Sequence, residues 1–138
     1  MSVESRQGAY LLSDDPARLE PAAIHAYLTT SYWAAGISLE TVQRSLRHSL
    51  CVGLYEAAGR QVGLARVITD RTTFAYLCDV YVLAPHRGRG LGQALIAAVV
   101  SHPDLQGLRL FNLLTRDAHG LYRQFGFLPT TRPEAYME

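Results

Sequence analysis

A run of closely spaced glycines constrains this chain more than any other feature of its sequence. Gly88, Gly90 and Gly92 stand between an apolar segment at 73–83 and a segment with helical periodicity. The apolar segment carries hydrophobic side chains on both of its alternating faces, as a central strand does. In the segment after the glycines, apolar residues recur at the spacing of a helix that packs by one face: Leu91, Ala94, Leu95, Ala98 and Val99. The sequence therefore predicts a strand, a glycine loop and a helix in direct succession.

The strand at 73–83 is expected to alternate without interruption. Asp79 is its single charged residue, and an unpaired charge in a central strand is costly. Asp79 therefore has either a functional role or a structural partner such as Arg66. In this pattern one face carries Phe74, Tyr76, Cys78, Val80 and Val82, and the other carries Ala75, Leu77, Asp79, Tyr81 and Leu83.

The rest of the chain alternates between helical and strand patterns, and no repeat, linker or low-complexity tract interrupts it. Its 138 residues, 49% of them hydrophobic, are enough to bury one core. We predict a single domain over residues 1–138, of the α/β (α+β) class, in which about four helices flank a mixed central sheet of about six or seven strands. The further elements expected are a strand at 8–13, a helix at 21–34, a short helix after the N-cap Ser38, a hairpin of strands at 50–56 and 61–69, a strand at 107–115, a helix at 117–125 and one or two short strands at 127–138.

The charged residues exclude several classes of function. The 13 basic side chains are all arginines, 12 acidic side chains oppose them, and the formal net charge is +1. A nearly neutral chain is not expected to bind nucleic acid. Without lysine the chain can form neither a lysine Schiff base nor the phosphate-binding lysine of a P-loop.

Cysteine and histidine usage points to a cytoplasmic protein without a metal site. Cys51 and Cys78 lie in apolar segments without metal-ligand spacing, so both are expected to be buried free thiols. The five histidines are scattered and form no ligand pair with a cysteine. The longest apolar run, 94–100, is too short to cross a membrane, and the N-terminus lacks an apolar signal-like stretch.

The glycine loop has the properties of a phosphate site. Closely spaced glycines leave backbone N–H groups unobstructed, and the first turn of a helix adds unpaired donors and a partial positive charge. Arg87 and Arg89 lie in the same loop and add charge, although a solvated surface turn is the alternative interpretation. The spacing fits neither a dinucleotide-binding loop, which needs G-x-G-x-x-G, nor a Walker loop, which needs Gly-Lys. The pattern present is Arg-x-x-Gly-x-Gly, formed by Arg87, Gly90 and Gly92.

This pattern resembles the acetyl-CoA motif of the GCN5-related N-acetyltransferase (GNAT) superfamily. A second segment, Leu121-Tyr122-Arg123-Gln124-Phe125-Gly126-Phe127, is similar to the Leu-Tyr-x-x-x-Gly-Phe segment of the same superfamily. The two motifs occur in the superfamily's order and together span about residues 79–127. The resemblance implies an acetyl-CoA-dependent N-acetyltransferase.

The resemblance also assigns the residues that would hold acetyl-CoA, the co-substrate. In the superfamily the pyrophosphate lies on the amides of the loop, and the pantetheine arm pairs with the strand before it, where one amide, here that of Val82, meets the thioester oxygen. Many members also carry a cofactor-binding asparagine where this chain has Thr115-Arg116-Asp117, so that contact is not expected here. The matching positions are Val80, Tyr81, Val82, Arg87, Gly88, Arg89, Gly90, Leu91, Gly92 and Gln93.

The same resemblance makes Tyr122 the general acid for the departing thiolate. With an ordinary pKa of roughly 10, above the roughly 8.5 of a thiol, a tyrosine holds its proton until the thiolate forms. The general base is less defined. Asp79 could attract the substrate ammonium or relay its proton, His119 has a suitable ordinary pKa, and a water chain needs no dedicated residue.

The acceptor is expected to be a primary amine of a small molecule or peptide. The superfamily's acceptor usually meets the first two helices and their connection, which here includes Tyr32 and Trp33, while Tyr76, Tyr136 and Arg44 are weaker candidates. The protein is expected to be a monomer or homodimer. A catalytically silent acyl-CoA-binding or regulatory module is the alternative to an enzyme.

Overall fold

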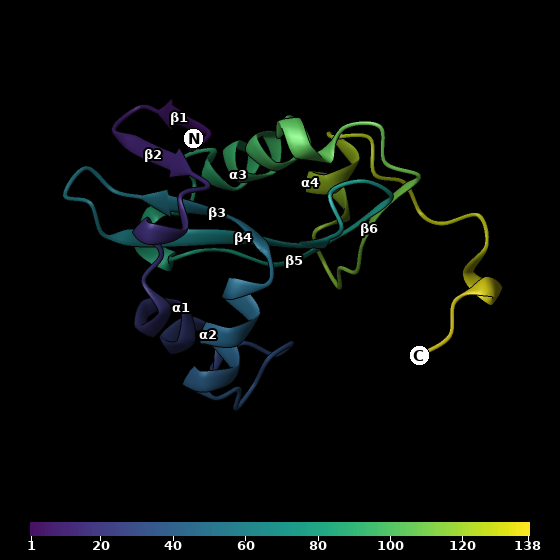
Figure 1. The fold of residues 1–138 in the computed structure, drawn as a ribbon, viewed down its shortest axis with the longest axis horizontal. Coiled ribbons are helices and arrows are strands. Elements are labelled where there is room, and N and C mark those ends of the chain that lie inside the picture. The colour runs from purple at the N-terminus through teal and green to yellow at the C-terminus, as the bar shows by residue number, and fades with distance from the viewer.

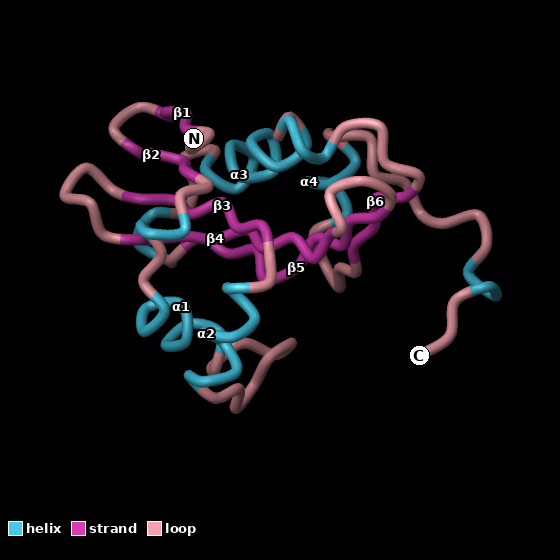
Figure 2. Tube along the Cα trace, in the orientation of Figure 1, coloured by secondary structure: helices cyan, strands magenta, loops and turns pink.

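The computed structural model describes all residues from 1 to 138, and its core is a single mixed six-stranded sheet with four α-helices (Figures 1 and 2). The strands follow one another across the sheet in chain order. The first four pairings are antiparallel and the last is parallel. The elements are β1 (Glu4–Gln7), β2 (Tyr10–Ser13), α1 (Pro21–Leu28), α2 (Leu39–Arg47), β3 (Leu50–Tyr55), β4 (Gln61–Thr69), β5 (Phe74–Val82), α3 (Leu91–Val100), β6 (Leu110–Leu113) and α4 (His119–Arg123).

The helices cover the two faces of the sheet in pairs. In Figure 1, α3 and α4 lie on one face and α1 and α2 on the other. Each face buries its own apolar cluster, because side chains alternate across a strand. The cluster on the α3 side includes Leu54, Ala65, Val67, Leu77, Leu95, Ile96 and Val99. The cluster on the α1–α2 side includes Ile24, Leu28, Val42, Leu46, Cys51, Leu64 and Tyr81.

The predicted class, the mixed sheet and the four helices are confirmed, but several boundaries differ from the sequence predictions. The strand expected at 8–13 is a hairpin, in which Gly8 adopts a φ of 59° at the turn between β1 and β2. The first helix ends at Leu28 rather than at 34, so Tyr32 and Trp33 lie in an irregular connection. Ser38 caps α2 as predicted, with its side chain accepting a hydrogen bond from the Thr41 N–H.

The C-terminal residues form no strand, contrary to the prediction for 127–138. Their only regular element is a short 3₁₀ turn at Pro133–Ala135. This stretch is rich in proline and threonine and runs out past β6 in Figure 1. A proline cannot donate to a strand ladder, which explains why the local pattern does not produce a strand here.

Strand β5 contains a one-residue bulge at Asp79. The φ of Asp79 is 51°, a left-handed conformation that aspartate tolerates better than most residues do. Such a bulge places an extra residue in one strand and increases the local twist. The register identifies it, because Arg66 pairs with Cys78 whereas Leu64 pairs with Tyr81.

The bulge changes which side chains share a face, so the expected unbroken alternation is wrong beyond Asp79. Tyr81 lies on the α1–α2 face, the same face as Cys78, because both pair with residues on one face of β4. Val80 and Val82 pack against the cluster on the α3 side.

The pairing between β5 and β6 stops before β5 itself ends. Its pairing with β6 covers only Phe74–Leu77, whereas its pairing with β4 continues to Val82. The outer edge of β5 is therefore open from Cys78 onward. This opening leads directly to the glycine loop and the start of α3.

Candidate active site

The glycine loop presents a series of free backbone donors. Gly88 and Gly90 have φ values of 79° and 73°, which only glycine adopts readily. The backbone N–H groups from Gly88 to Gln93 donate to no backbone carbonyl, while the next one, that of Ala94, begins the helical ladder at the Gly90 carbonyl. The ten-residue helix α3 adds the positive end of its dipole at the same point. The loop therefore has the geometry of an anion site.

The two arginines of the loop make contacts within the chain rather than projecting freely. Arg87 donates from Nε to the Val82 carbonyl at 2.8 Å and from Nη2 to the Tyr27 hydroxyl at 3.2 Å. Arg89 donates from Nη1 to the Tyr10 hydroxyl at 3.3 Å. Arg87 thus links the end of β5 to α1, a relationship that the sequence pattern did not indicate.

The open edge of β5 is supported from the α1 side. The Tyr81 ring stacks on the Tyr27 ring at a centroid distance of 4.1 Å and an interplanar angle of 9°. Beyond Leu77 no strand pairs with the outer edge of β5, so no neighbouring strand takes up the main-chain groups of Val80 to Val82 on that side. An extended ligand can therefore pair with this edge as a further strand would.

Tyr122 lies in α4 and is 9% exposed. Its ring meets Phe127 edge-on at a centroid distance of 6.1 Å, which fixes the ring on the short helix. Burial raises the pKa of the Tyr122 hydroxyl, and the nearby Tyr32 raises it further. The hydroxyl therefore keeps its proton at neutral pH. His119, one turn earlier, is exposed.

Both oxygens of Asp79 have partners. Arg66 donates from Nε to Oδ2 at 2.7 Å, and Trp33 donates from Nε1 to Oδ1 at 2.8 Å. The pairing with Arg66, one of the two sequence interpretations, is thus present. Arg66 also donates from Nη1 to the Ser49 hydroxyl at 3.0 Å, and its pKa is raised despite burial because Cys78 and Asp79 favour its charged form.

Tyr32 and Trp33 lie together at the surface beside this network. Their exposed fractions are 55% and 41%, and their rings meet edge-on at 5.1 Å. The guanidinium of Arg116, from the segment between β6 and α4, lies 3.7 Å from the centroid of the Tyr32 ring. Sequence reasoning did not identify Arg116 as a site residue, because no local pattern reports a contact between such distant segments.

Neither thiol has the properties of a nucleophile. Cys51 and Cys78 are both free, as predicted, although Cys78 is only half-buried. Burial raises the pKa of Cys51 to about 12 and that of Cys78 to about 11. No group of three or more His, Cys, Asp or Glu side chains is placed to hold a metal ion.

Comparison with known proteins decides the family. Residues 47–129 match the family model described as the acetyltransferase (GNAT) domain. The chain belongs to the GNAT acetyltransferase family. A Gibberella zeae protein named as a presumed acetyltransferase is 37% identical over 84% of this chain and 77% of its own length.

Solved structures agree with this GNAT assignment. The crystal structure of a presumed GNAT acetyltransferase from Xanthomonas campestris is 52% identical, covers 94% of this chain and 91% of its own, and superimposes with a TM-score of 0.91. A presumed acetyltransferase from Clostridium acetobutylicum, described with acetyl-CoA, shares the fold, with a TM-score of 0.66 at 14% identity, covering 100% of this chain and 95% of its own.

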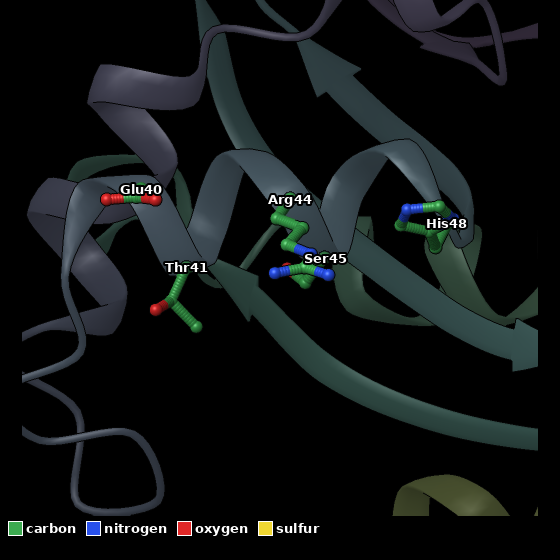
Figure 3. A pocket seen from close by; sticks show the side chains of 5 residues that line it. All are labelled: Glu40, Thr41, Arg44, Ser45 and His48. Carbon is green, nitrogen blue, oxygen red and sulfur yellow. The ribbon is translucent and has the colours of Figure 1, made fainter.

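The weaker candidates for contact with the acceptor lie in two different pockets of this GNAT domain. A cavity of about 990 Å³ is lined by Tyr122, His119, Tyr76 and Tyr136, among others. Arg44 lines a different, shallow hollow that is formed by α2 and its C-terminal residue alone (Figure 3). Arg44 therefore lies apart from Tyr122. No helix is both long and apolar enough to span a membrane.

Proposed function

We propose that this GNAT domain, taken as one functional unit, transfers an acetyl group from acetyl-CoA to a primary amine of a small molecule or peptide. The observation that carries the proposal is the row of free N–H groups from Gly88 to Gln93 beside the open edge of β5. Free amides at a helix N-terminus bind phosphate, and an open strand edge pairs with an amide-containing chain. The two features match the pyrophosphate and the pantetheine arm of one ligand.

The amine attacks the thioester carbonyl directly. The nitrogen forms a bond to the carbonyl carbon, the carbonyl oxygen takes the negative charge, and the carbon–sulfur bond then breaks. We assign the N–H of Val82 to that oxygen, since Val82 lies on the open edge of β5. Arg87 supports this end of the strand through its 2.8 Å hydrogen bond to the Val82 carbonyl.

Tyr122 supplies the proton that the departing thiolate needs. Its pKa is raised by burial, so it carries a proton at neutral pH and still donates as sulfur becomes negative. Tyr122 also lines the cavity between β6 and the C-terminal residues.

Asp79, in our proposal, attracts the substrate ammonium and does not act as the base. Its two oxygens already accept hydrogen bonds from Arg66 and Trp33, so neither is left without a donor as the oxygen of a general base would be. A carboxylate oxygen accepts more than one hydrogen bond, so a cation can still approach. The ammonium loses one proton to water before the attack, and the nitrogen loses a second as the amide forms, which replaces the proton that Tyr122 gives to the thiolate.

A thermal melt with and without acetyl-CoA, followed by release of free thiol against a panel of amines, tests the proposal. At 100 times its dissociation constant, acetyl-CoA should add about 2.7 kcal/mol of stability, or about 8 °C for a domain of this size. A shift with amine-dependent thiol release supports the enzyme. A shift with no release for any amine favours the silent acyl-CoA-binding module, and no shift contradicts both.

A further inference from the structure

The contact between Arg116 and Tyr32 joins two segments on opposite sides of the opening in the sheet. Tyr32 follows α1, whereas Arg116 follows β6, and the guanidinium carbon lies 3.7 Å from the ring centroid. The only carboxylate near Arg116 is that of Asp117, at 3.8 Å, and both side chains of this pair are mostly exposed, at 64% and 72%. An ion pair this long and this exposed contributes little, so the charge of Arg116 is not neutralised within the chain.

The stacked geometry leaves one part of the guanidinium free. A guanidinium carbon 3.7 Å from the ring centroid leaves no room for an N–H group between the two, so we infer that the flat face of the group is toward the Tyr32 ring and that its N–H donors point away in the plane of the group. Stacking also restricts the long side chain before any ligand arrives, which lowers the entropy cost of binding. A planar donor edge of this kind matches a carboxylate or a phosphate, because each offers two oxygens at the right spacing.

Arg116 and Asp79 are connected through one aromatic pair. Tyr32 contacts both Arg116 and the Trp33 ring, and Trp33 donates to Asp79. A negative group and a positive group therefore each contact one ring of this exposed aromatic pair.

We propose that Arg116 binds an anionic group of the acceptor, a carboxylate or a phosphate, so that the preferred acceptors are amines that carry a negative charge on the same molecule. In this arrangement the ammonium faces Asp79 and the anion pairs with the guanidinium of Arg116. This inference rests on the proposed acetyl transfer to an amine.

Matched acceptors test the proposal. ω-Amino acids of increasing chain length are each compared with the alkylamine of the same length, and phosphoethanolamine is compared with ethanolamine. We expect kcat/KM to be at least about tenfold higher for the anionic member of the best pair, because a charge-assisted hydrogen bond is lost in its neutral counterpart. The carboxylate and phosphate pairs distinguish the two kinds of anion. Equal values of kcat/KM in every pair would overturn the proposal.

The variant R116Q should lower kcat/KM for the anionic acceptors alone. The ratio of kcat/KM for the anionic acceptor to kcat/KM for its neutral counterpart should therefore fall toward one. R44Q is the matched control: Arg44 is also exposed, its loss changes the net charge equally, and it lies on the outer hollow of α2 (Figure 3). R44Q should leave the ratio unchanged. An R116Q variant that slows both members of a pair equally, or neither, would contradict a role in recognising the anion.

Binding measured without turnover separates this inference from the proposed function. With CoA in place of acetyl-CoA, calorimetry on the wild type and R116Q compares the affinities of the same pairs. Tighter binding of the anionic member in the wild type, lost in R116Q, supports the Arg116 site even if no acetyl group is transferred. Equal affinities in the wild type overturn it, whether or not acetyl transfer is observed.

Discussion

The indole of Trp33 donates a hydrogen bond of 2.8 Å to Oδ1 of Asp79, which joins the connection between α1 and α2 to the bulge of β5. The other oxygen of Asp79 accepts from Arg66 at 2.7 Å. The bulge lies next to the point where β5 parts from β6. The aromatic surface that is proposed to meet the acceptor is therefore attached to the strand edge that is proposed to hold the thioester.

Loss of the Asp79 charge should destabilise the fold. Its side chain is 9% exposed and that of Arg66 is 16% exposed, so the variant D79N leaves a largely buried guanidinium without its anion. Removing one partner of such a pair costs about 3 kcal/mol, and asparagine tolerates the left-handed backbone as aspartate does. W33F, which removes only the indole donor, should cost about 1 kcal/mol. Denaturant unfolding measures both variants and their combination.

The double variant D79N/W33F should lose less stability than the two single variants added together, because D79N removes the charge that strengthens the hydrogen bond lost in W33F. D117N is the control, since it also removes one negative charge but from a side chain that is 72% exposed. Its effect should stay within about 0.5 kcal/mol. Additive single effects, or a D79N variant as stable as D117N, would show that the network is absent in solution.

The glycine loop and the tyrosine helix could be predicted from sequence because their signals are local. Three glycines before a periodic helix, and Tyr122 on a short amphipathic segment, need no knowledge of distant partners. The antiparallel hairpin of β3 and β4 was likewise evident from two apolar runs around a turn. The sequence Glu-Ser-Arg-Gln of β1 was not recognised as a strand, because it lacks alternation and is specified by pairing with β2.

The contacts around the proposed acceptor side could not be predicted, because they depend on how distant segments meet. The bulge at Asp79 follows from pairing with β4 and leaves no mark in the strand's own pattern. The contact of Arg116 with the Tyr32 ring likewise leaves no mark in the local sequence pattern. Residue type suggested that Asp79 needed a partner, and the fold supplied two.

The backbone conformation of Gly90 should matter for acetyl-CoA more than its lack of a side chain does. A methyl group at Gly90 would meet nothing closer than Gln93 Oε1 at 3.6 Å, but alanine resists a φ of 73°. We expect G90A to lose about 1 kcal/mol of stability and to bind acetyl-CoA at least about tenfold more weakly, since the free amides would be reoriented. Calorimetric titration gives the dissociation constant.

G107A is the matched control for G90A. Gly107 has a φ of 70° and open space around it, and it precedes Arg109, whose N–H bonds to Thr73 at the opposite end of β5. G107A should lose similar stability while keeping the affinity for acetyl-CoA. Equal weakening in both variants would show that destabilisation, not the loop, limits binding.

The turn between β4 and β5 should make the fold sensitive to acid. The Asp70 carboxylate accepts hydrogen bonds from the backbone N–H groups of Thr72, Thr73 and Phe74 and from the Thr73 hydroxyl, which hold its pKa well below the usual range. A lowered folded-state pKa stabilises the fold above the unfolded pKa of about 4, and this contribution is lost as the pH falls below that value.

The variant D70N should therefore melt at a lower temperature than the wild type at pH 7. The difference should narrow as the pH is lowered from about 4 toward about 2, because the wild-type carboxyl then loses its own charge. Thermal unfolding at several pH values measures this. A difference that stays constant down to the lowest pH would rule out the carboxylate as its source.

The raised pKa of Tyr122 predicts the shape of the pH profile for acetyl transfer. Burial and Tyr32 both keep the hydroxyl protonated, so kcat should rise with pH as the amine loses its proton and should show no descending limb below about pH 10. A steady-state profile with a saturating amine measures it. A fall in kcat between about pH 7 and 9 would mean that the acid is a group other than Tyr122.

The variant Y122F tests the central claim most directly, when acetyl-CoA affinity and kcat are measured on the same preparation. Phenylalanine keeps the ring that packs against Phe127 and removes only the hydroxyl group. The dissociation constant should stay within about twofold of the wild type, while kcat should fall by about a hundredfold to ten-thousandfold. An unchanged kcat in Y122F, or a loss of activity fully explained by weaker acetyl-CoA binding, would contradict the assignment of Tyr122 as the acid.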